Sequence, residues 1–252
     1  MPSTTRRRLG AVCGSVILAV AMSFFGISSA EATEKLCQVK NTTQNTWFAT
    51  HSGLALSHAL ATAEPGDRLA VIGTCRGAFL VTVDLTIVGS SDGTTTLRGT
   101  GVGAILSTAS DTTVRLLRLR LSGNTAGGLV VAEGSNVTLS HSRVTRNSSS
   151  RAGGGIQNGG NLTVNYSLIL RNNTASDGGG IFNFGDLVVN ASILNNNVAD
   201  GVGGGLFTEG VATLNRSRVR FNEAASGGGI RAVNVLTLNE TIVSDNIPDD
   251  CC

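Results

Sequence analysis

The chain has 252 residues, of which 33 are glycine, and only 14% are charged and 4% aromatic. With 41% apolar residues and so little charge, the composition argues against an intrinsically disordered protein, and the few aromatic rings argue against nucleic-acid binding by base stacking. The formal net charge is +2, but three of the 19 basic residues are Arg6, Arg7 and Arg8. Without them 16 basic side chains oppose 17 acidic ones, which leaves no positive excess to attract nucleic acid.

Residues 1–30 have the pattern of a secretory signal peptide. Three arginines precede an apolar run from Leu9 to Ile27, and Ser28-Ser29-Ala30 provide the small residues of a cleavage site. We therefore expect a protein that is secreted or displayed at the cell surface. An uncleaved membrane anchor is the alternative, because the apolar run is nearly long enough to span a bilayer.

Residues 31–68 are predicted to form an N-terminal segment with a capping helix. The apolar stretch Leu54–Ala63 is typical of a short amphipathic helix, and Glu64-Pro65-Gly66-Asp67 ends it with a turn. Strand-like segments follow at Val83–Gly89 and Val114–Leu121. The helix is expected to cover the first coil of a repeat domain over residues 69–252, since solenoids need caps.

The glycines recur at a fixed period. Four copies of a Gly-Gly-Gly-(Ile/Leu) motif follow one another in steps of 24 or 25 residues, after a degenerate copy at Gly127-Gly128-Leu129. The four copies begin at Gly153, Gly178, Gly203 and Gly227. A period in this range indicates a repeat architecture.

Each repeat has the alternation of β-strands. Apolar pairs two residues apart are followed by an Asn, then by a small hydroxyl residue, and a second Asn closes the repeat. The pairs are Leu162/Val164, Leu187/Val189, Ala212/Leu214 and Leu236/Leu238; the first Asn column is Asn165, Asn190, Asn215 and Asn239; the closing column is Asn124, Asn147, Asn172, Asn197, Asn222 and Asn246. Three short strands fit one repeat, which predicts an all-β fold, a right-handed parallel β-helix of about seven coils. Apolar columns fill its interior, both Asn columns hydrogen-bond from coil to coil, and glycine supplies positive φ at a corner.

The repeats over residues 127–250 resemble those of the chlamydial polymorphic outer membrane proteins, which alternate Gly-Gly-Ala-(Ile/Leu/Val) with Phe-x-x-Asn. In this chain Gly replaces the Ala, and an aliphatic residue replaces the Phe, as in Ile169-x-x-Asn172. Residues 54–99 also look like the opening of exported bacterial proteins of the pectate-lyase-like superfamily, with Gly73-Thr74-Cys75-Arg76-Gly77 followed by Leu85-Thr86-Ile87-Val88-Gly89. The first resemblance implies an adhesin and the second a polysaccharide-degrading enzyme.

Cysteine usage agrees with export. Four cysteines lie outside the predicted signal, and Cys37 and Cys75, both near the cap, are the candidate disulfide. Cys75 and Cys251 are expected to lie too far apart along the stack to pair. No CxxC motif or His-containing spacing suggests a metal, so we predict no metal and no cofactor.

Nine Asn-x-Ser/Thr sequons occur, four of them in the first Asn column, which we expect to point inward and to serve the ladder rather than glycosylation. Carboxylates are candidates for lyase or hydrolase chemistry, but only Asp177 and Asp200 fall near one another on successive coils, in solvated loops. No catalytic residue is assigned.

Six arginines lie on the second predicted strand of a repeat or in the turn beside it: Arg143, Arg146, Arg171, Arg216, Arg218 and Arg220. Arginine binds carboxylate and sulfate with two parallel hydrogen bonds. Five of them, Arg143, Arg146, Arg171, Arg218 and Arg220, are therefore candidate ligands of an acidic polysaccharide. The alternative is a solvated face that keeps a flat sheet from aggregating.

Three functions remain open from the sequence. The first is an exported, non-enzymatic protein for adhesion or contact with polysaccharide or cell-surface glycans, without nucleic acid as a partner. The second is a lyase or glycoside hydrolase of the pectate-lyase-like superfamily, and the third is an envelope scaffold without ligand. The uncovered last coil, with Leu238 and Ile242 at its edge, also predicts end-to-end self-association, locked by Cys251 or Cys252.

Overall fold

The computed structural model describes residues 36–50 and 53–251. The predicted signal peptide, the alternative anchor and Cys252 therefore lie outside the described residues. Within the described ranges, no helix is long and apolar enough to cross a membrane.

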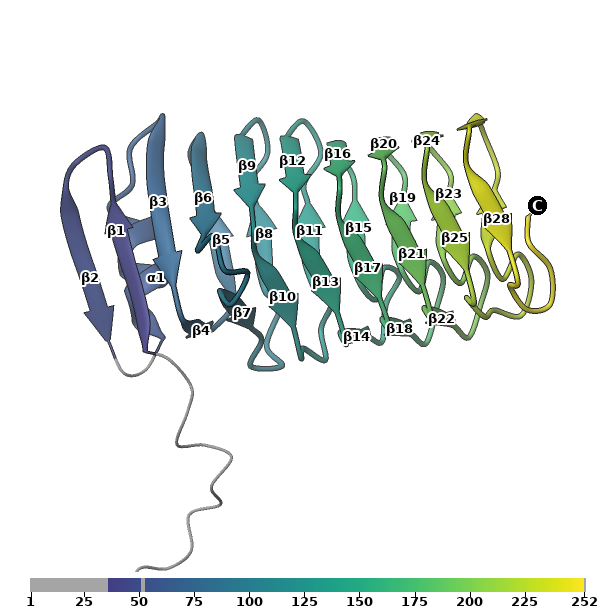
Figure 1. Ribbon diagram of the computed structural model, residues 1–252, viewed down its shortest axis with the longest axis horizontal. Coiled ribbons are helices and arrows are strands. Elements are labelled where there is room, and N and C mark those ends of the chain that lie inside the picture. The colour runs from purple at the N-terminus through teal and green to yellow at the C-terminus, as the bar shows by residue number, and fades with distance from the viewer. Residues whose placement is uncertain (1–35, 51–52, 252) are drawn as a thin grey trace, which may run out of the picture. The chain divides into compact units, whose positions relative to one another are not determined.

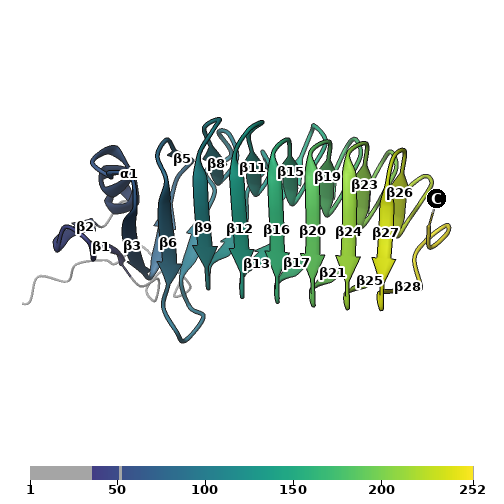
Figure 2. The ribbon, with the colours of Figure 1, turned by 90° about the horizontal axis from the view of Figure 1, so that it is seen from above.

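The described residues form stacked coils whose strands make three long sheets, parallel except at β1, and one small sheet (Figures 1 and 2). The first sheet has the order β2 (Thr46–Thr50), β1 (Cys37–Asn41), β3 (Asp67–Ile72), β6 (Leu85–Gly89), β9 (Thr113–Leu117), β12 (Asn136–Ser140), β16 (Asn161–Asn165), β20 (Asp186–Asn190), β24 (Val211–Asn215) and β27 (Leu236–Asn239). Two pairings in it are antiparallel, that of β1 with β2 and that of β1 with β3, so β1 alone runs against the other strands.

The other sheets follow the same order along the stack. The second contains β4 (Thr74–Arg76), β7 (Thr96–Arg98), β10 (Arg120–Ser122), β13 (Arg143–Thr145), β17 (Leu168–Leu170), β21 (Ile193–Asn195), β25 (Arg218–Arg220) and β28 (Ile242–Ser244). The third contains β5 (Phe79–Val81), β8 (Leu106–Thr108), β11 (Leu129–Val131), β15 (Ile156–Asn158), β19 (Ile181–Asn183), β23 (Leu206–Thr208) and β26 (Ile230–Ala232). A small sheet joins β14 (Ser148–Ser149), β18 (Asn173–Thr174) and β22 (Val198–Ala199).

One apolar core runs through the coils. On β16, Leu162 and Val164 are buried, whereas Asn161 is exposed, as the alternation predicts. Because the strands pair in register, Val164 stacks between Leu139 and Val189. Each coil thus buries its apolar side chains against the coils before and after it.

Glycine forms one corner of each regular coil. The first glycine of every triplet has a positive φ, from 58° at Gly227 to 78° at Gly153. The third glycine faces the next coil at close range: a Cβ on Gly180 would lie 2.4 Å from the carbonyl oxygen of Gly205. The triplets therefore combine a backbone conformation and a close approach that other residues disfavour.

The other two corners use left-handed residues that are not glycine. Tyr166 has a φ of 49° and Arg171 a φ of 54°. The equivalent positions in other coils are His141, Ala191, Arg216 and Glu240 at the first corner, and Arg146, Asn196, Phe221 and Asp245 at the second. Such residues cost about 1–2 kcal/mol each relative to right-handed backbone, so the hydrogen bonds next to them must hold the corners.

The predicted asparagine ladder supplies those bonds at the second corner. The side-chain amides of Asn147, Asn172, Asn197 and Asn222 each donate to the Oδ1 of the next asparagine, at 2.9–3.2 Å. Each Oδ1 also accepts from the backbone N–H one coil earlier, as Asn197 does from Asn172 at 3.0 Å. The closing Asn column is confirmed as a buried ladder.

The first Asn column also forms a ladder, but its expected inward direction is wrong. Asn190 donates to Asn165 at 2.9 Å, and Asn239 donates to Asn215 at 2.8 Å. These side chains are half-buried or exposed, because each ends a strand on the outward side of the pleat. The buried group is the hydroxyl two residues later: Ser192 Oγ accepts from the Ser167 backbone N–H at 3.0 Å.

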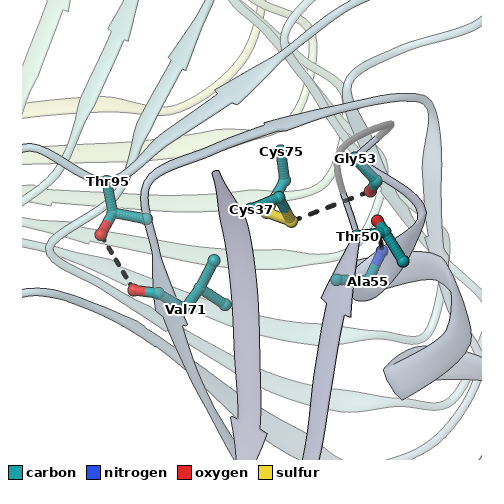
Figure 3. Close-up of a disulfide and its surroundings, with 7 residues drawn as sticks. All are labelled: Cys37, Thr50, Gly53, Ala55, Val71, Cys75 and Thr95. Carbon is teal, nitrogen blue, oxygen red and sulfur yellow. Dashed lines mark hydrogen bonds between the residues drawn. A yellow bond between two sulfur atoms is a disulfide. The ribbon is translucent and has the colours of Figure 1, made fainter. Parts of the chain in front are cut away.

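The two ends of the stack differ. At the first end, α1 (Leu54–Ala61) packs on β1 and β2, and the hairpin of these two strands covers β3; the helix was predicted, two residues longer, and the hairpin was not. Cys37 and Cys75 are joined by a disulfide that ties β1 to β4 (Figure 3).

At the other end, Leu238 and Ile242 are 39% and 55% exposed. Residues 247–251 close one corner there, where Asp250 accepts from the Asn246 amide and ends the ladder. Cys251 is itself disulfide-bonded, so its sulfur offers no free thiol for the predicted intermolecular lock.

Candidate functional site

Arginines gather on the outward face of the second sheet, over its early coils. Arg120 on β10 stands in register with Arg143 on β13, and Arg98 ends the neighbouring strand β7. Arg118 and Arg146 occupy left-handed corners beside the same strands, with φ of 53° and 55°. We call Arg98, Arg118, Arg120, Arg143 and Arg146 the basic surface.

Two adjacent cavities open on the basic surface. The first, of about 270 Å³, is lined by Arg118, Arg120 and Arg143 together with His141 and Tyr166. The second, of about 290 Å³, is lined by Arg98, Arg120 and Arg146 with hydroxyl residues. Arg120 belongs to both. Among the described residues that line either cavity there is no Asp or Glu, so their shared character is cationic.

Arg120 is held in an unfavourable environment for a cation. Its side chain is half-buried, and its Nε is a buried atom without a hydrogen-bond partner. Burial lowers the pKa of Arg120 below its ordinary value, and the charges of Arg143 and Arg146 lower it further. An anion bound between the cavities would offset both effects, since it accepts hydrogen bonds and carries the opposite charge.

An aromatic pair borders the first cavity. The rings of His141 and Tyr166 are stacked, with centroids 5.1 Å apart and planes inclined by only 8°. Tyr166 is 60% exposed, because the left-handed corner turns its side chain outward. The pair is a flat apolar face next to guanidinium groups, which suits a ligand with both ring faces and anionic groups.

The predicted arginines divide into two groups. Arg143 and Arg146 belong to the basic surface, and Arg171 occupies the next corner after Arg146. Arg218 and Arg220 lie on β25, and in the column of Arg218 two apolar residues, Leu168 and Ile193, separate it from Arg143.

The region around Arg218 is also less cationic. A cavity of about 320 Å³ there is lined by Arg216 and Arg218, but also by the carboxylate of Glu240. The guanidinium of Arg220 lies over the ring of Phe221, 5.5 Å from its centroid.

Sequence reasoning missed Arg98, Arg118 and Arg120. They precede even the degenerate glycine copy at Gly127, so no motif showed that they align with the later repeats. The signal was present in Leu121, which is the core residue equivalent to Val144 and shares its register.

The two acidic residues that the sequence placed near one another, Asp177 and Asp200, differ in their contacts. Asp177 Oδ1 accepts a hydrogen bond from the backbone N–H of Val202 at 2.8 Å, so this carboxylate joins two coils, while Asp200 is exposed. In the part of the chain that the structure describes, no group of three or more His, Cys, Asp or Glu side chains is placed to hold a metal ion.

Comparison with known proteins decides the fold family. Residues 87–247 match the family described as the right handed beta helix region. The chain belongs to this family. The predicted fold, a right-handed parallel β-helix of about seven coils with a short capping helix, is confirmed.

More distant comparisons add little to the β-helix assignment. No curated protein matches the chain. A crystal structure of alginate lyase from Paenibacillus sp. str. FPU-7 is similar with a TM-score of 0.41 and 14% identity, over 79% of this chain and 97% of that one. The resemblance to the chlamydial polymorphic outer membrane proteins finds no support in these matches and stays a prediction.

Proposed function

We propose that this β-helix is an exported, non-enzymatic protein that binds an anionic polysaccharide at its basic surface, for adhesion or glycan contact. The observation that carries the proposal is the pair of adjacent cavities that share Arg120 and are lined by five arginines without an acidic residue among the described lining. A face that only prevents aggregation needs charge, but it needs neither hollows nor a half-buried arginine.

The geometry suits a polymer with a repeating anionic group. Arg120 and Arg143 are in register on neighbouring strands, which places them about 4.8 Å apart along the stack. Successive sugar rings of an extended polysaccharide advance by a comparable length. Each guanidinium can take a carboxylate or sulfate with two hydrogen bonds, and the exposed Tyr166 ring offers a face to a pyranose.

The test compares two triple variants that lose the same charge. Arg118→Gln, Arg143→Gln and Arg146→Gln remove three exposed cations of the basic surface. The matched control, Arg115→Gln, Arg216→Gln and Arg218→Gln, removes three exposed cations elsewhere. Binding of residues 31–252 to alginate, polygalacturonate and heparin is measured at several salt concentrations, with a lyase absorbance assay on the same polymers.

We expect the first variant to lose at least about tenfold in affinity and to show a weaker salt dependence. The control is expected to stay within about twofold of the unmodified protein. Equal losses in both variants, or no binding by the unmodified protein, would contradict the proposal. Release of unsaturated sugar in the absorbance assay would favour the lyase alternative instead.

A further inference from the structure

A second hollow lies on a different face, along the third sheet. This groove, of about 470 Å³, is floored by Ser107, Val130 and Gln157. These are the outward positions of β8, β11 and β15, and they stand in register on three successive coils. The groove therefore follows the axis of the stack, and its floor extends over two strand spacings, about 10 Å.

The groove exists because the repeats change there. Along the floor column, the residues after Gln157 are Phe182 and Phe207, which are much larger than Ser107 and Val130. The corner beside it shows the same change: Ala126 and Ala152 stand before the glycines in the early coils, and Asp177 and Val202 stand there in the later ones. Small side chains leave the hollow open, and larger ones fill the equivalent space from β19 onward.

One wall of the groove is held in place by the next coil. Ser149, Ser150 and Arg151 form it. The Ser149 hydroxyl accepts from the backbone N–H of Arg151 at 3.0 Å, and the hydroxyl of Thr174 donates to the Arg151 carbonyl oxygen. A wall tied down in this way loses little conformational freedom on binding, which favours a preformed site.

Aromatic side chains gather where the groove floor ends. Phe182 follows Gln157 in the column, and its ring lies 5.3 Å from that of Phe207 and 5.8 Å from that of Phe184. Phe184 is 47% exposed. The groove thus has hydroxyl and amide groups along its floor and wall, one cation at Arg151, and an aromatic surface beyond β15.

We propose that this groove binds a neutral, extended oligosaccharide of β-1,4-linked pyranose rings. Serine hydroxyls and the Gln157 amide both donate and accept hydrogen bonds, as sugar hydroxyls require. No carboxylate lies among the described lining residues, and a single arginine gives little attraction for a polyanion. A straight floor over three coils suits a chain that stays straight, which β-1,4 linkages favour and α-1,4 linkages do not.

The experiment fills the groove with the phenylalanine side chain that occupies its floor column in the later coils. Val130→Phe and, separately, Ser107→Phe place at these positions the residue that occupies the same column on β19 and β23. Thr163→Phe puts the same ring on the outward face of the first sheet, as the matched control. Gln157→Ala removes the amide without adding bulk, and thermal melting of each variant checks that it is folded.

Binding of cellohexaose, chitohexaose and maltohexaose is measured by calorimetry. We expect cellohexaose or chitohexaose to bind at least about tenfold more tightly than maltohexaose, and Val130→Phe and Ser107→Phe to weaken that binding at least about tenfold. Thr163→Phe and the triple variant of the basic surface are expected to bind as the unmodified protein does. The last result separates this site from the polyanion proposal.

Three results would overturn the inference. They are the absence of binding to both straight hexasaccharides, as expected if a peptide or a second copy of the chain occupies the groove; equal binding of maltohexaose; and unchanged binding by the folded Val130→Phe and Ser107→Phe variants.

Discussion

The coils before Gly153 and those after it are built by the same stacking but differ in regularity. From Gly153 onward the glycine triplets and both Asn columns recur every 24 or 25 residues, and each carries an unbroken set of hydrogen bonds between coils. Earlier coils keep the apolar core but carry arginines, small residues and longer turns on the outside. The regular coils concentrate the interactions that stabilise the stack, and the irregular ones provide the shaped surfaces.

Both proposed sites lie almost wholly in the irregular half. The cavities of the basic surface reach no further than Leu168, and the groove on the third sheet ends at Gln157. A strictly repeated column gives a flat or evenly ridged face, because every coil presents the same side chain. Departures from the repeat are therefore where hollows arise in this fold.

The largest effect we expect tests the regular half. Asn172→Ala removes an amide that donates to Asn197 and to the Val144 carbonyl oxygen, and an Oδ1 that accepts from Asn147. Several buried polar groups would lose their partners, at about 1–3 kcal/mol each. We expect the free energy of unfolding to fall by about 3–5 kcal/mol, seen as a drop in the melting temperature of about 8–15 °C.

The neighbouring residue provides the control for this change. Asn173 is exposed on β18, and Asn173→Ala is expected to shift the melting temperature by no more than about 2 °C. If the two variants have the same melting temperature, Asn172 contributes no more to stability than an exposed asparagine does. The regular coils would then owe their stability to the apolar core alone.

A smaller effect compares glycines of the two halves. Gly180→Ala places a Cβ 2.4 Å from the carbonyl oxygen of Gly205, so neighbouring coils must separate. We expect a loss of about 2–3 kcal/mol. Gly93, in the irregular half, has a φ of 71° and nothing within 4 Å of an added Cβ, so Gly93→Ala is expected to cost only about 1 kcal/mol of backbone strain.

Chemical denaturation of both alanine variants measures this difference. An equal loss in the two would mean that close approach of the coils matters no more than the φ preference, and the glycine triplets would then need another explanation.

The same contrast explains what the sequence revealed. The ladder at Asn172 and the corner at Gly153 were predictable because identical residues at a fixed period must stack in a solenoid. The left-handed corner at Tyr166 was not predictable, because the residue type there changes from coil to coil and only the positive φ is shared. The β1–β2 hairpin occurs once and leaves no periodic signal.

The candidate sites were predictable only in part. Arg143 and Arg146 follow the degenerate glycine copy at Gly127 and were found, whereas Arg120 precedes even that copy and was missed, although it is the residue shared by both cavities. Periodicity cannot identify a binding surface whose residues do not recur from coil to coil.

The smallest expected effect distinguishes a binding surface from a solvated face. The folded-state pKa of Arg120 lies below its ordinary value, through burial first and then through Arg143 and Arg146. The unfolded state therefore holds this proton more tightly, so the charged Arg120 destabilises the fold at every pH below the lowered pKa, including pH 7. Arg143→Gln or Arg146→Gln removes one source of this repulsion.

Each of these variants is expected to raise the melting temperature at pH 7 by about 1–2 °C, while Arg115→Gln, on the first sheet, leaves it unchanged. Differential scanning calorimetry at low salt measures the shift, which added salt should reduce because it screens the exposed charges. A fall in melting temperature would show that Arg143 or Arg146 stabilises the folded protein, which would contradict the proposed charge repulsion with Arg120. Weaker polysaccharide binding together with a higher melting temperature is the pair of results that a solvated face does not produce, because such a face gains nothing from keeping charges that destabilise the fold.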